Sequence, residues 1–100
     1  MATNFTYRIL SCQTWDIYDD NLDVEIDLSD GRGYSATFFT IPNIRTLMNK
    51  NRVTGECSGG LYLWASNMII IENLGSDTIE RTIAGLIEDK EIDAVCYRLR

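Results

Sequence analysis

Histidine is absent from the 100 residues of this chain. Histidine is the usual general base of enzymes and a common ligand of catalytic metals. Its absence excludes Ser-His-Asp and Cys-His catalytic arrangements and the usual zinc sites. A mechanism that relies on carboxylates alone stays open, although no motif indicates one. The sequence therefore predicts a protein that is not an enzyme, with no catalytic residues, no cofactor and no metal site.

Cysteine is scarce and long apolar runs are missing. Cys12, Cys57 and Cys96 form no C-x-x-C pair, which excludes a zinc ribbon or a thioredoxin-like site and favours reduced thiols in a cytosol. The longest strongly apolar run covers only residues 68–71, far short of the roughly 20 residues that span a bilayer. Residues 1–5 lack the basic opening and the apolar stretch of a signal peptide. We expect a soluble, cytoplasmic protein with no membrane partner.

Proline occurs once, and no repeat, low-complexity segment or linker is present. With 45% apolar and 24% charged residues, residues 1–100 have the composition and length of a single globular domain. Aromatic and β-branched residues at 5–14 predict a strand. Apolar and polar residues alternate over 22–28, turn-forming residues follow at 29–33, and residues 34–40 are expected to return as the partner strand.

The pattern then changes to helical spacing. Thr40 can cap a helix in which Pro42 fits the first turn and Gly55 marks the end. Its apolar face consists of Ile44, Leu47 and Met48. Residues 61–64 and 68–71 are expected to form a second hairpin.

A second helix and a last strand complete the prediction. Ser76 or Asp77 can cap this helix, and its apolar stripe consists of Ile79, Ile83, Leu86 and Ile87. A short strand is expected within residues 92–99. The order β-β-β-α-β-β-α-β predicts an α+β fold, a mostly antiparallel sheet with two helices on one face.

Negative charge is concentrated in one segment of the chain. Seven acidic residues and no basic residue lie between Asp16 and Asp30. The rest of the chain contains eight acids and all nine bases, so it carries +1 of a formal net charge of −6. The net negative charge therefore resides in one loop and one strand.

The strand pair is expected to place part of this charge on its solvent face. If the turn pairs Leu28 with Tyr34, the aliphatic residues of 22–28 face the buried side. The open side then carries a row of acids with no basic neighbour across the pair, namely Asp23, Glu25 and Asp27. Repulsion within the row costs stability, and a positively charged partner would relieve it.

The loop before this strand interleaves acids with aromatic residues, and Trp and Tyr are favoured anchors of protein interfaces. We therefore predict a partner-binding surface made of Trp15, Asp16, Tyr18, Asp19, Asp20, Asp23, Glu25 and Asp27. Two alternatives stay open. The acids can be the plain solvated face of an amphipathic strand, where charge discourages aggregation. Trp15 can be buried at a strand end.

Calcium and nucleic acid fit this surface poorly. Asp19, Asn21, Asp23 and Asp30 coincide with four ligand positions of a calcium-binding loop, but Val24 occupies the position that must be glycine. The chain also has no basic stripe that would neutralise phosphates. We expect no direct nucleic-acid ligand.

Residues 34–71 resemble a group of short bacterial proteins. The resemblance rests on YSATFFT (34–40), NI (43–44), LM (47–48), TGEC (54–57), WAS (64–66) and MII (68–70). Such proteins are immunity partners encoded beside toxins, including contact-dependent growth inhibition systems. The resemblance implies no catalytic motif, and shared residues such as Phe38, Leu47, Trp64 and Ile70 are those expected of a core. The acidic segment lies outside the matching region, as a partner-specific surface would.

The resemblance and the acidic surface together favour an immunity protein that binds and neutralises a cognate bacterial toxin domain by blocking its active site or substrate groove. A nuclease fits best, since an acidic patch complements a basic substrate groove. The partner is then a basic protein, and the chain itself is expected to be a monomer or weak dimer. The alternative that stays open is an acidic, non-enzymatic inhibitor or adaptor of another basic nucleic-acid-binding protein, of the phage anti-defence type.

Overall fold

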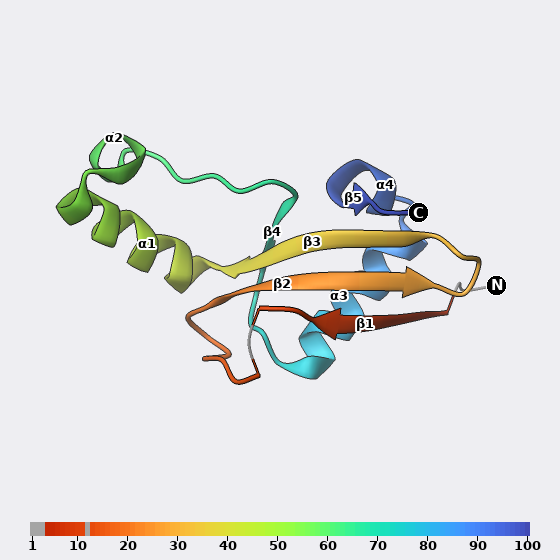
Figure 1. Ribbon diagram of the computed structural model, residues 1–100. Helices are drawn as coiled ribbons and strands as arrows, with labels where there is room; N and C mark the ends of the chain where they lie inside the picture. The colour runs from red at the N-terminus through yellow and green to blue at the C-terminus, as the bar shows by residue number, and fades with distance from the viewer. Residues whose placement is uncertain (1–3, 12) are drawn as a thin grey trace.

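A computed structural model describes residues 4–11 and 13–100, and within them one five-stranded sheet and four helices (Figure 1). The strands are β1 (Phe5–Ile9), β2 (Asn21–Leu28), β3 (Gly33–Thr40), β4 (Met68–Ile71) and β5 (Tyr97–Arg98). The helices are α1 (Ile41–Thr54), α2 (Glu56–Gly60), α3 (Ser76–Glu88) and α4 (Ile92–Val95). The strand order is β1-β2-β3-β4, β5 also pairs with β3, and only the β3–β4 pair is parallel. The predicted α+β fold with a mostly antiparallel sheet is confirmed.

The β2–β3 hairpin has the predicted faces but a different register. Ile26 lies opposite Tyr34, so the predicted pairing of Leu28 with Tyr34 is wrong by two residues. The turn is tighter than expected, because the Leu28 amide donates to the Arg32 carbonyl at 2.8 Å and Gly31 adopts a φ of 96°. A left-handed residue of this kind is typical of three-residue hairpin loops. Since side chains alternate with a period of two, the aliphatic residues of β2 still point into the core.

Helices α3 and α4 supply the other side of the core. Ile79 and Ile83 are buried, and Leu86 and Ile87 pack against the same cluster, which confirms the predicted stripe of α3. Ile92 of the short helix α4 is buried in that cluster as well. The strand predicted within residues 92–99 is correspondingly short, because residues 92–95 form α4. Two helices therefore do contribute to one face of the sheet, but the helix after Thr40 is not one of them.

Helix α1 begins and ends as predicted yet extends away from the sheet (Figure 1). The Thr40 hydroxyl accepts a hydrogen bond from the Asn43 amide at 3.3 Å, and Gly55 ends the helix with a left-handed φ of 87°. Thr40 is both the last residue of β3 and the helix cap, so no turn folds α1 back. The molecule measures 48 × 23 × 22 Å as a result. We call residues 41–67 the arm, and none of them belongs to the core cluster.

The predicted second hairpin is wrong, because residues 61–67 form no strand. Strand β4 pairs in parallel with β3, with Met68 opposite Thr37. Trp64 and Ile70, which we expected in the core, are 69% and 58% exposed, whereas Phe38 is buried as expected. The predicted first strand also ends early, at Ile9.

Within the described residues, no helix has the length and apolar character needed to cross a membrane. Cys57 and Cys96 carry free thiols, and Cys12 lies outside the described residues. Burial raises the pKa of the Cys96 thiol to about 11.

Candidate functional site

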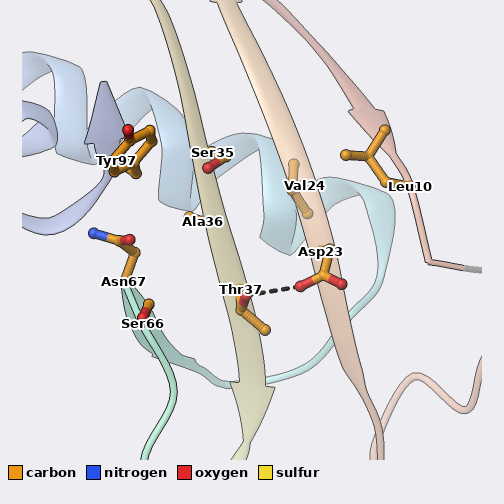
Figure 2. A pocket seen from close by; sticks show the side chains of 9 residues that line it. All are labelled: Leu10, Asp23, Val24, Ser35, Ala36, Thr37, Ser66, Asn67 and Tyr97. Carbon is orange, nitrogen blue, oxygen red and sulfur yellow. Dashed lines mark hydrogen bonds between the residues drawn. The ribbon is translucent and has the colours of Figure 1, made fainter. Parts of the chain in front are cut away.

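The carboxylates predicted to form a row on β2 do lie on the face of the sheet opposite α3. Glu25 faces Ser35 across the strand pair, and Asp23 faces Thr37. The Thr37 hydroxyl donates to the Asp23 carboxylate at 2.8 Å (Figure 2). The predicted row is therefore confirmed, and the two-residue difference in register determines which residues of β3 it faces.

Across the β2–β3 pair the row faces no basic residue, as expected, but two of its three members have a basic partner from elsewhere in the chain. Arg8 of β1 forms a salt bridge with Glu25, and Arg100 forms one with Asp27. Both arginines are distant in sequence, and only the β1–β2 pairing and the position of the C-terminal residues bring them here. Among the described residues, Asp23 is the member of the row that no salt bridge reaches.

The acidic loop before β2 is ordered by its own carboxylates. Asp16 accepts hydrogen bonds from the backbone amides of Tyr18 at 2.9 Å and Asp19 at 3.2 Å, and Asp20 accepts from the amide of Asp16 at 3.3 Å. Such local side-chain to backbone bonds are the usual way in which Asp stabilises a tight turn. The loop turns the Tyr18 side chain outward, where it is 64% exposed.

Asp19 joins this loop to the beginning of α1. Its carboxylate accepts hydrogen bonds from the Asn43 side-chain amide at 3.1 Å and from the Thr46 hydroxyl at 3.0 Å. A negative charge at this end of a helix is favourable, because the helix dipole is positive there. The Asp19 carboxylate therefore has structural partners outside the loop, whereas the carboxylates of Asp16 and Asp20 bond only to backbone amides of the loop and of the adjoining Asn21.

Trp15 is attached to the body of the protein. Its indole N–H donates to the Leu74 carbonyl at 2.9 Å, and its half-buried ring packs against the core cluster. The neighbouring Ile17 carbonyl accepts a bond from the Leu74 amide at 2.7 Å. This geometry matches the burial alternative for Trp15, so Tyr18 is the aromatic residue of the loop that is free to meet a partner.

A shallow groove of about 480 Å³ lies on the same open face (Figure 2). Asp23 and Thr37 line it together with Leu10, Ser35 and Tyr97, and residues 66–67 form a further part of its wall. Sequence reasoning missed Tyr97, because a tyrosine in a short terminal strand carries no signal of which face it occupies. The alternation of β2 indicated that its polar residues lie on this face of the sheet. It gave no information on which residues of other strands, such as Tyr97, complete the groove.

The exposed apolar residues of the arm were also missed. Leu61, Tyr62 and Trp64 are all exposed, although their four-residue apolar run resembled a buried strand. Short apolar runs do not distinguish a buried strand from other structures. The consecutive glycines Gly59 and Gly60 before the run were the available sign of irregular backbone.

A second charged cluster lies at the other end of β3. The Tyr34 hydroxyl donates to Asp93 at 2.6 Å, and the Arg98 guanidinium lies 3.2 Å from Asp93 and 5.5 Å from the centre of the Tyr34 ring. Burial raises the pKa of Tyr34, and the hydrogen bond from Tyr34 lowers the pKa of Asp93. Because each group has its partner inside the protein, the cluster ties β3 to α4 and β5. No group of three or more potential metal-ligating side chains occurs within residues 4–11 and 13–100.

Comparison with family models, curated proteins and solved structures finds no significant match to this chain.

Proposed function

We propose that this chain is an immunity protein that binds a bacterial toxin domain and neutralises it by covering its active site or substrate groove. The observation that supports this function most is the group of carboxylates along residues 16–23 that no described basic residue neutralises, next to the exposed ring of Tyr18. Uncompensated charge attracts a partner of opposite sign over a distance. An exposed aromatic ring then holds that partner once it is buried in the contact.

A nuclease domain is the partner that suits this chemistry best. Nucleases bind the phosphates of their substrates with Lys and Arg side chains. The carboxylates of Asp16, Asp20 and Asp23 would occupy the positions of those phosphates and exclude the substrate. Charge complementarity of this kind raises the association rate, while burial of Tyr18 lowers the dissociation rate.

Growth rescue tests this function. The toxin candidate is the protein encoded directly upstream of this chain, and we expect it to stop growth when it is produced alone in bacterial cells. Co-production of the wild-type chain should restore growth, and the triple variant Asp16→Asn, Asp20→Asn, Asp23→Asn should restore it poorly. Asn keeps one side-chain oxygen, which suffices for the bonds that a single oxygen of Asp16 and of Asp23 accepts, whereas Asp20 loses one of its two bonds.

The matched control is the double variant Glu25→Gln, Asp27→Asn. These carboxylates are already occupied by Arg8 and Arg100, so on this proposal they lie outside the toxin contact and the variant changes charge at a different place on the molecule. We expect the control to rescue growth nearly as well as the wild type. The proposal is wrong if the upstream protein is harmless, or if it is toxic and the wild-type chain gives no protection.

A further inference from the structure

Five of the eleven exposed large apolar residues in the described part of the chain lie on the arm. Its exposed large apolar residues are Ile41, Val53, Leu61, Tyr62 and Trp64. Val53 is 89% exposed and Leu61 is 77% exposed, so these side chains are not partly shielded by the body. Single exposed apolar residues are ordinary, but several on one projecting segment indicate a surface that is covered in use.

Few interactions within the arm stabilise its own structure. Helix α1 has 14 residues, and isolated helices of that length are marginal in water. It packs mainly against α2 and the end of β3. In α2, Cys57 and Ser58 adopt φ values of 51° and 53°, in the left-handed region that residues with side chains rarely occupy. A partner that covers the arm would therefore stabilise it.

The charge of the arm selects among possible partners. Residues 41–67 contain three bases, Arg45, Lys50 and Arg52, and one acid, Glu56, so the arm carries +2. The rest of the chain contains six bases and fourteen acids and carries −8. A basic toxin domain would be repelled by the arm. The acidic body of a second copy of this chain is complementary to it.

The position of Trp64 makes a two-fold arrangement possible. In a two-fold dimer, a projecting group and the site that receives it must lie on the same surface, so that each copy gives and receives the same contact. Trp64 precedes the groove-lining residues Ser66 and Asn67 by only two and three positions. The groove of about 480 Å³ has the size of small-molecule sites and can accept an indole ring, with Tyr97 as an apolar wall and Asp23 as a negative one.

We infer that two copies of this chain associate about a two-fold axis, each packing the apolar residues of its arm, with Trp64 at the centre, into the open-face groove of the other. The dimer needs the arm and the groove but not Tyr18, Asp16 or Asp20, so Asp23 is the residue that the two contacts share. The dimer therefore goes beyond the proposed toxin neutralisation, and either one can fail without the other.

Sedimentation equilibrium of the purified chain tests the dimer. We expect a mass of twice 11.4 kDa at high protein concentration and weaker association at high salt, because salt screens the attraction between arm and body. Trp64→Ser should weaken the dimer by at least about tenfold, as loss of a central aromatic anchor does. Ser66→Arg should have the same effect, because it fills the groove and adds positive charge beside it.

Two matched controls should leave the dimer intact. Tyr18→Ser removes an exposed aromatic ring from the acidic loop, and Ser29→Arg adds the same charge at the distant β2–β3 hairpin. The inference is wrong if the wild type sediments as an 11.4 kDa species at every concentration tested, or if Ser66→Arg dimerises like the wild type. Circular dichroism shows whether Trp64→Ser is folded, and if it is not, Ser66→Arg decides the question.

Discussion

Replacement of Ile83 by Ala tests which helix forms the core. Ile83 lies in the middle of α3 and is fully buried against the sheet. The substitution removes three buried carbon atoms, which forfeits about 2.4 kcal/mol at about 0.8 kcal/mol per group. The cavity left behind adds to this, so we expect a total loss of about 3–4 kcal/mol in the free energy of unfolding. This loss is a large part of the free energy of unfolding of a typical domain, which is roughly 5–15 kcal/mol.

Urea unfolding followed by circular dichroism measures this loss, and Leu47→Ala is the matched control. Leu47 lies on the predicted apolar face of α1, but it is only partly buried and lies outside the core cluster. Leu47→Ala should lower the free energy of unfolding by less than half as much as Ile83→Ala does. Both variants are compared at one protein concentration, because association shifts apparent stability. If Leu47→Ala costs as much as Ile83→Ala, α1 packs on the core and the extended arm is wrong.

Three further predictions concern individual side chains. Thr40→Ala should lower the free energy of unfolding by about 1 kcal/mol, because it removes the cap that accepts from the Asn43 amide; urea unfolding measures this. The advantage of the wild type over Asp93→Asn in thermal midpoint should be present in full above about pH 4 and be lost as the pH falls further, through the folded-state pKa of Asp93, which the bond from Tyr34 lowers. An unchanged difference at acid pH would contradict this. Mass spectrometry should find Cys96 unmodified by iodoacetamide at pH 8 in the folded protein, since burial raises the pKa of its thiol to about 11.

Local patterns predicted the individual elements well where one periodicity dominated. The alternation in β2 fixed its buried face, and the stripe of α3 identified Ile79 and Ile83 as core residues. The register was wrong because it depends on the turn. Gly31 and Gly33 both permit positive φ, and only the structure shows that Gly31 adopts it, in a three-residue loop.

Long-range contacts were the part that the sequence did not reveal. Arg8 and Arg100 reach the acidic row from opposite ends of the chain, so no local pattern linked them to Glu25 or Asp27. The arm was missed for a related reason. An apolar face at helical spacing predicts that a helix packs against something, but it does not say whether that surface belongs to the same molecule.

The rate of association with the upstream-encoded toxin domain tests the central claim most directly. We expect the triple variant Asp16→Asn, Asp20→Asn, Asp23→Asn to associate more slowly than the wild type and to lose most of its salt dependence, because the steering field comes from these carboxylates. Stopped-flow or surface-based kinetics at low and high salt measure both quantities. An association rate and a salt dependence equal to those of the wild type would show that the acidic segment is only a solvated surface, and would contradict the account.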